Sequence, residues 1–217
     1  MRISVNEEPN EKEDYIVEAP YEEAIQAADC ELVINDLIEV ILLSKKILDK
    51  SNEPQKDDHE IKAFWMSAVV TYIKCFNHGT RYKIDSRIYE LIPGAVDAHE
   101  YFKDIRDKYI AHSIGALENS KTLLVLSPKI ENNLKFLRVS SFNYRQLYPA
   151  LENIQTLISL AEEAKKVTAE FRERMLAEVA QKAANESIEV LYALPYASMT
   201  IPGRNEIRSN RKKSKTI

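Results

Sequence analysis

The sequence predicts a mainly α-helical fold: an up-down bundle of four main helices, the last of them long, with a small two-stranded β insertion after the third. Two observations predict this fold class. Apolar residues recur at steps of three and four along most of the 217 residues. The chain also has only 4 Gly and 8 Pro, whereas a many-stranded sandwich or barrel needs frequent turn residues.

The first two helices are predicted from helical spacing and from capping residues. The first is expected over about residues 21–50, because Pro20 suits a first helical turn and is followed by a periodic apolar series, Ile25, Ala28, Leu32, Leu37, Ile41, Leu42 and Leu48. The second is expected to begin at Asp57 and Asp58, which can cap it, and to end at Gly79. Its centre is apolar on nearly all sides, which indicates that other helices surround it.

A third helix is expected over about residues 95–114. A connector that contains a short helix near residues 86–91 stops before it at Pro93-Gly94. The apolar stripe of the third helix consists of Ala98, Phe102, Ile105 and Tyr109, and Gly115 can serve as its left-handed stop.

Two strands are expected after the third helix, at Thr122–Ser127 and Leu134–Ser140. Both are rich in Leu, Val and Phe, and they flank a segment with Pro128 and Asn132-Asn133. Because two strands alone are marginally stable, we expect them to lie on the helices or to pair in an oligomer.

The long last helix is expected from about Tyr144 through Val179, with Pro149 either opening it or kinking it near its start. These elements predict three regions: an acidic disordered N-terminus (1–19), a helical domain (20–195) and a basic disordered tail (196–217).

The N-terminal segment has no apolar leader, and no apolar run reaches the ~20 residues that a membrane crossing requires. The sequence therefore predicts a cytoplasmic protein with no membrane partner. Cys30 and Cys75 have no partner at Cys-x-x-Cys spacing, and we expect them to be small buried apolar residues. A net charge of −4 argues against nucleic-acid binding over the whole surface but leaves room for a local site.

Most familiar motifs of cofactor and metal chemistry are absent. The sequence has no phosphate-binding Gly-rich loop, no dinucleotide-binding fingerprint, no His-Glu-x-x-His pair and no Cys/His set at zinc spacing. We therefore predict no cofactor and no metal site.

One segment in the third helix carries chemistry. Arg106-Asp107-Lys108-Tyr109-Ile110-Ala111-His112-Ser113 resembles the Arg-x(4-6)-His motif of the HEPN superfamily, with five residues between the Arg and the His. The resemblance covers about residues 22–179, and HEPN domains are helical bundles that carry the motif late in a helix. Toxins of one HEPN type have a Tyr two residues after the His, whereas this chain has Ile114.

The resemblance implies metal-independent RNA cleavage, with Arg106 and His112 as the catalytic residues at a composite site across a homodimer. It also implies a role in a toxin–antitoxin or phage-defence system, with an antitoxin or nucleotidyltransferase partner. The chemistry is coherent, because an imidazole can exchange a proton with a ribose hydroxyl and a guanidinium can hold phosphoryl oxygens. One His per chain supplies either the general acid or the general base, and two copies of His112 would supply both.

Helix geometry and burial leave an alternative open for this pair. Six steps of an α-helix turn the chain by about 600°, which puts Arg106 and His112 about 120° apart unless the helix end frays or two chains contribute. Alternatively, His112 continues the apolar stripe as a buried histidine, and Arg106 forms ordinary ion pairs.

Three residues are candidates for supporting roles, and each has a second interpretation. Asp107 can orient Arg106 or lie on the surface. His99 can line the same groove, although a solvated helix face is the favoured interpretation. Glu118 can hydrogen-bond the imidazole of His112, although a charge in a loop is favoured.

Four residues are candidates for RNA binding: Arg81, Tyr82, Lys83 and Lys108. The first three follow the second helix, where basic side chains can instead complement the helix dipole. Two other functions stay open. One is a non-catalytic HEPN-like module that binds RNA, a nucleotide or a protein, and the other is a structural adaptor in which the motif is incidental.

Overall fold

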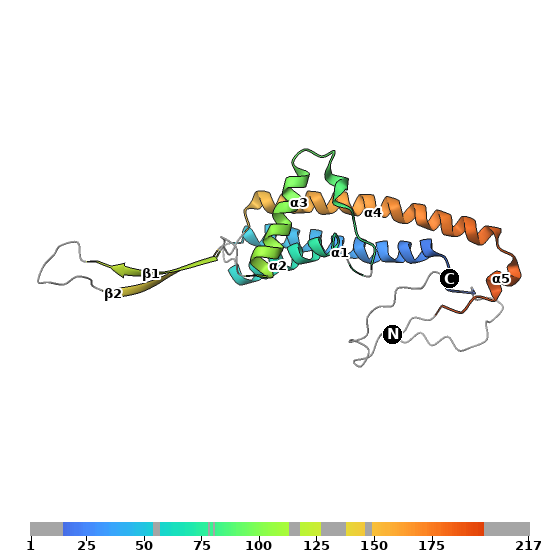
Figure 1. Ribbon diagram of the computed structural model, residues 1–217, viewed down its shortest axis with the longest axis horizontal. Helices are drawn as coiled ribbons and strands as arrows, with labels where there is room; N and C mark the ends of the chain where they lie inside the picture. Colours follow the sequence, from blue (N-terminus) through green and yellow to red (C-terminus); the bar gives the residue numbers. More distant parts are fainter. Residues whose placement is uncertain are drawn as a thin grey trace, which may run out of the picture. The chain divides into compact units, whose positions relative to one another are not determined.

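The computed structural model is mainly helical and confirms the predicted fold class (Figure 1). It describes residues 15–53, 57–77, 79, 81–112, 118–126, 138–145 and 149–197. The described residues form four longer helices, three short helical elements and two strands. The elements are α1 (Glu22–Ser51), α2 (Asp58–Lys74), the 3₁₀-helix η1 (Ser86–Tyr89), α3 (Ala95–Asp104), the π-helix η2 (Ile105–Ile110), β1 (Glu118–Val125), β2 (Arg138–Arg145), α4 (Leu151–Asn185) and α5 (Ile188–Tyr192).

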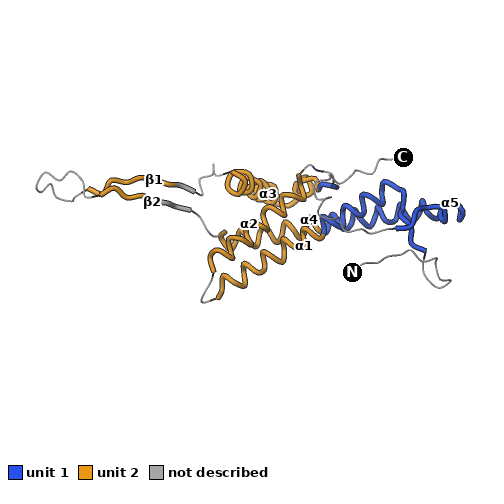
Figure 2. Tube along the Cα trace, turned by 90° about the horizontal axis from the view of Figure 1, so that it is seen from below, with its two compact units in different colours: residues 1–34, 78–83, 166–217 blue, residues 35–77, 84–165 orange. Residues whose placement is uncertain are grey.

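The chain forms two compact units (Figure 2). Unit 1 consists of residues 1–34, 78–83 and 166–217, and unit 2 consists of residues 35–77 and 84–165. The helices α1 and α4 each contribute residues to both units. The Arg-x(4-6)-His segment lies in unit 2.

In unit 2, α2 runs antiparallel to the second half of α1. Lys50 Nζ lies 2.7 Å from a carboxylate oxygen of Glu60 near the start of α2. Lys74 Nζ lies 2.9 Å from Asp36 Oδ1 at the other end of that helix. Partly exposed ion pairs of this kind contribute about 0–1 kcal/mol each. They define the register of the two helices, whereas buried apolar side chains supply most of the stability.

The predicted start of α2 is confirmed, but its predicted end is not. The side chain of Asp57 accepts hydrogen bonds from the backbone N–H groups of His59 and Glu60, which is the cap that the sequence predicts. The helix ends at Lys74 rather than at Gly79. It ends early because the last turn tightens, and the N–H of Cys75 bonds to the carbonyl three residues before it.

A buried chain of hydrogen bonds joins four elements of unit 2. His99 Nδ1 of α3 lies 2.9 Å from Tyr72 Oη of α2, which lies 3.0 Å from Tyr89 Oη of η1. Tyr89 Oη donates to the backbone carbonyl of Leu160 in α4 at 2.8 Å. All three side chains are buried.

The donor and the acceptor of each of these hydrogen bonds follow from the number of protons that the side chains carry. Tyr89 has one hydroxyl proton and donates it to the Leu160 carbonyl, so Tyr72 must donate its proton to Tyr89. Tyr72 Oη is then left to accept, and the proton between it and His99 must come from Nδ1. The network therefore assigns the Nδ1–H tautomer to His99. Burial raises the pKa of both Tyr72 and Tyr89, so both keep their protons.

Aromatic rings pack around these polar groups. The Phe76 ring lies 4.5 Å from the His99 ring, and the Trp65 ring lies 5.8 Å from that of Phe102, between centroids. Trp65 and Tyr72 are buried core residues. Both rings are therefore part of the core and are not exposed for stacking on bases.

The hairpin is present, with strands shifted from their predicted limits. The antiparallel register pairs Glu118 with Arg145 and Val125 with Arg138, so β1 begins earlier and β2 later than the sequence suggested. Both strands are mostly exposed, so of the two predicted ways to stabilise the hairpin, packing of these strands on the helices is not observed. The predicted turn residues between the strands lie outside the described residues.

In unit 1, a carboxylate of α1 and two rings fix the loop that follows α2. The Tyr82 N–H donates to Asp29 Oδ2 at 2.9 Å, and the Tyr82 ring stacks on that of Phe171 at 4.9 Å. Cys30 is buried, as predicted, and burial raises its pKa to about 11, with a smaller contribution from the charge of Asp29. The Cys75 thiol, in unit 2, is buried as well.

The long helix α4 begins at Leu151, so Pro149 precedes this helix and does not kink it. Beyond α5, the chain returns to residues 15–18: Val17 pairs with Tyr196, and the Ala197 N–H donates to the Ile16 carbonyl at 3.1 Å. The pairing of Val17 with Tyr196 is an isolated bridge and belongs to no strand. None of the helices in the described part of the chain has the length and apolar content to span a bilayer.

We predict that Tyr72→Phe lowers the free energy of unfolding by about 1–3 kcal/mol, because it leaves buried groups of His99 and Tyr89 without their partner. Tyr101→Phe is the matched control, since Tyr101 is 41% exposed and its hydroxyl accepts one hydrogen bond, from Asn153. Equilibrium unfolding in urea measures the free energy of unfolding of both variants. An equal, small loss in the two would show that the buried chain of hydrogen bonds does not stabilise the fold.

Candidate functional site

The third helix changes its winding where the motif begins. After Asp104 the chain forms the π-helical turn η2, and the Ala111 N–H donates to the Arg106 carbonyl, five residues back, at 2.9 Å. The helix therefore ends at Ile110 rather than at the predicted residue 114. The expected separation of about 120° assumed α-helical winding, so it does not apply here. π-Helical turns are rare in proteins, and those that do occur are often found at functional sites.

Arg106 and Asp107 form an ion pair on this turn. Arg106 Nη1 lies 2.6 Å from Asp107 Oδ1, and the two side chains are 40% and 44% exposed. Asp107 thus contacts the Arg106 guanidinium and also lies partly exposed at the surface, so both interpretations of Asp107 stay open. A guanidinium has five N–H donors, so this contact leaves donors for a phosphate. A pair this exposed is also weak, and an incoming anion can compete with the carboxylate.

His112 lies just after the turn and is exposed to solvent. The alternative in which it continues the apolar stripe as a buried histidine is therefore wrong. The reason is that η2 ends before His112, so helical spacing no longer determines which way this side chain faces. Its imidazole forms no hydrogen bond or ion pair with any described residue.

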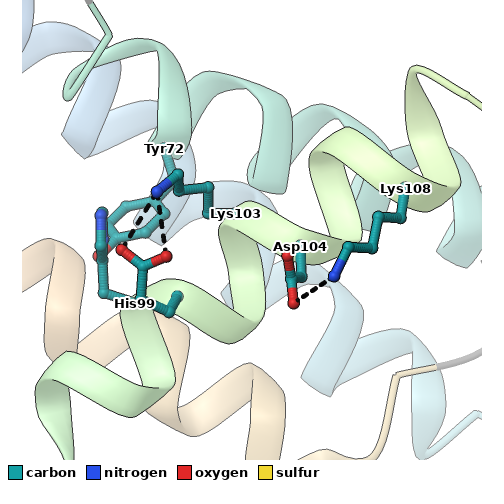
Figure 3. Close-up of polar contacts among 6 residues, drawn as sticks. Tyr72, His99, Lys103, Asp104 and Lys108 are labelled. Carbon is teal, nitrogen blue, oxygen red and sulfur yellow. Dashed lines mark hydrogen bonds and ion pairs between the residues drawn. The ribbon is translucent and has the colours of Figure 1, made fainter.

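Lys108 adds a second cation to the same turn. Its ammonium lies 2.9 Å from Asp104 Oδ2, one helical turn back, and the side chains are 57% and 60% exposed (Figure 3). The exposed surface of η2 thus holds two cations, each paired with a nearby carboxylate. Within the described part of the chain, no hydrogen bond joins Arg106 to His112.

His99 departs from its favoured interpretation, because it is not on a solvated face. It is 4% exposed and lies in the core, bonded to Tyr72. Burial lowers its pKa, so the neutral form is favoured. A sequence signal for this existed: His99 follows Ala95 by four residues and precedes Phe102 by three, which places it on the buried face with both.

The remaining candidates are spread over other elements. Glu118 is the first residue of β1 and pairs with Arg145, so the favoured interpretation of a loop charge is wrong. Arg81, Tyr82 and Lys83 belong to unit 1, whereas the motif belongs to unit 2. There, Tyr82 is half-buried under its stacking contact with Phe171, while Lys83 is exposed.

Neither a metal-binding cluster nor a similar known protein indicates the function of this turn. The described residues contain no group of three or more His, Cys, Asp or Glu side chains that could hold a metal ion. Comparisons with models of protein families, with curated proteins and with solved structures find no match. The function must therefore be argued from the side chains of the turn itself.

We predict that the thermal stability of the protein falls as the pH drops below about 6.5, the ordinary value for His. Because the pKa of folded His99 is lowered, the unfolded chain takes up a proton there that the folded chain does not. The contribution of neutral His99 to stability is fully present above about pH 6.5, and it is lost as the pH falls toward the pKa of His99 in the folded state.

The variant His99→Gln should flatten this acid dependence, and the melting temperature over a pH series measures it. His59→Gln is the control, since His59 is exposed at the start of α2. If His99→Gln and wild type lose stability with the same slope on acidification, His99 is not the group responsible.

Proposed function

We propose that this protein is a HEPN-like, metal-independent endoribonuclease of the cytoplasm that acts in toxin–antitoxin or phage defence. Arg106 and His112 would form a composite site across a homodimer. The observation that carries the proposal is the exposed imidazole of His112 directly after a π-helical turn that bears the guanidinium of Arg106. The motif wording from Arg106 to Ser113 supports the same assignment.

The reaction needs only groups that this turn offers. In the first step, the ribose 2′-oxygen bonds to phosphorus, and the bond from phosphorus to the 5′-oxygen breaks. One imidazole takes the 2′-hydroxyl proton, and a second, protonated imidazole gives a proton to the leaving 5′-oxygen. The products are a 2′,3′-cyclic phosphate and a free 5′-hydroxyl. Each chain contributes one His112, so two copies are required.

Arg106 suits the other half of the chemistry. Negative charge grows on the non-bridging oxygens as phosphorus becomes five-coordinate, and a guanidinium can donate to two such oxygens at once. Asp107 holds the guanidinium in place before RNA binds. Lys108 adds an electrostatic attraction that does not depend on base sequence.

A partner that silences the site is part of this proposal. An antitoxin, or a nucleotidyltransferase that modifies the protein, would fulfil that role in a toxin–antitoxin pair. The absence of Tyr two residues after His112, where Ile114 stands, argues against control by modification at that position.

We predict that the purified full chain cleaves single-stranded RNA in the presence of a metal chelator. His112→Ala and Arg106→Ala should each lower the rate by about 10²-fold or more, because one removes the proton transfer and the other the charge stabilisation. Gel electrophoresis of labelled RNA measures the rate, and the product ends show whether a cyclic phosphate forms.

Two matched controls come from the same unit. His59→Ala removes an exposed His, and Arg87→Ala removes an exposed Arg that is paired with Asp85 at 2.6 Å, much as Arg106 is paired with Asp107. Both should cleave at the wild-type rate. Cleavage that survives His112→Ala and Arg106→Ala, or that stops in chelator, would reject the assignment. RNA binding without cleavage would instead indicate the non-catalytic HEPN-like module.

A further inference from the structure

The hairpin exposes apolar side chains on both of its faces. Leu124 is paired with Val139 on one face, and these side chains are 63% and 58% exposed. On the other face, Leu123 is 43% exposed and Phe142 is 57% exposed. A two-stranded sheet with no apolar face covered is marginally stable at best. These side chains therefore indicate a covering surface that the described residues of one copy do not provide.

One edge of the hairpin is suited to pairing with another strand. Within the described residues, the sheet contains β1 and β2 alone, so the outer edge of β1 has no neighbouring strand there. Residues 122–126 of that edge, Thr-Leu-Leu-Val-Leu, contain no charge, Pro or Gly. Natural sheets protect exposed edges with such residues, and a strand without them is a template for pairing.

Charge distinguishes the two edges. A strand that pairs antiparallel with its own copy over its full length places its first residue opposite the last. For β2 this would bring Arg138 opposite Arg145, and like charges directly opposite destabilise a sheet. For β1, Glu118 and Lys121 sum to zero, and the apolar half of the strand can face itself with no charge opposed.

We propose that the β1 edges of two copies pair antiparallel about a two-fold axis that passes between their Leu124 residues, so that two hairpins form one four-stranded sheet. Leu124 of one copy then lies opposite Leu124 of the second copy. Because opposite residues share a face, Val139 and Leu124 of the first copy and Leu124 and Val139 of the second copy form a continuous apolar row. The axis is perpendicular to the sheet, so it keeps this row on a single face.

Sedimentation or light scattering of the full chain over a range of concentrations tests the pairing. We expect the wild type to be a dimer. For Leu124→Lys we expect the Kd of the dimer to rise about tenfold or more. Leu91→Lys is the matched control, because Leu91 is 95% exposed in the turn after η1 and takes no part in the hairpin. Leu91→Lys should remain as fully dimeric as the wild type.

A covalent test keeps the proposal falsifiable if the Lys variant disrupts the hairpin itself. The variant Leu124→Cys places the thiols of the two copies opposite each other across the proposed seam, at a separation that a disulfide can bridge. Oxidation should give a linked dimer, whereas Leu91→Cys should stay monomeric on a denaturing gel.

Several outcomes would overturn the pairing: a monomeric wild type, a Leu124→Lys protein that dimerises as tightly as Leu91→Lys, or a Leu124→Cys protein that does not cross-link. RNA cleavage measured on the same samples separates this inference from the proposed function. A dimer that does not cleave RNA leaves the pairing intact, whereas a monomer that cleaves RNA rejects the pairing alone.

Discussion

The buried hydrogen bonds from His99 through Tyr72 and Tyr89 to the Leu160 carbonyl constrain unit 2 more than any other interaction described in it. They join α3, α2, η1 and α4 at one point in the core. A buried polar group without its partner costs about 1–3 kcal/mol, so each of these elements is held to the others by polar geometry as well as by apolar packing.

The candidate site depends on this arrangement because it continues the same helix. His99 fixes α3 in the core, and η2 follows without a break, so the turn that carries Arg106 and Lys108 starts from an anchored helix. The π-helical winding then ends the helix before His112 and leaves the imidazole exposed. Within fourteen residues the chain thus places one histidine in the core and another on the surface.

Helical periodicity and capping residues predicted the fold, since α1, the Asp57 cap and the hairpin all follow from local patterns. The π-helical turn could not be predicted, because its sequence is compatible with an α-helix and tertiary packing decides the winding. Local spacing also failed to find the network of His99 with Tyr72 and Tyr89, whose members lie up to 27 residues apart. Strand limits shifted because hairpin register depends on pairing rather than on composition.

The most direct test of this account is the nitrogen NMR spectrum of the His99 imidazole in the folded protein, with His99→Gln used to assign the signal. The account predicts a neutral ring with its proton on Nδ1, unchanged as the pH is lowered to about 6.5, where an ordinary histidine is half protonated. A ring that carries its proton on Nε2, or one that is half protonated at that pH, would contradict it.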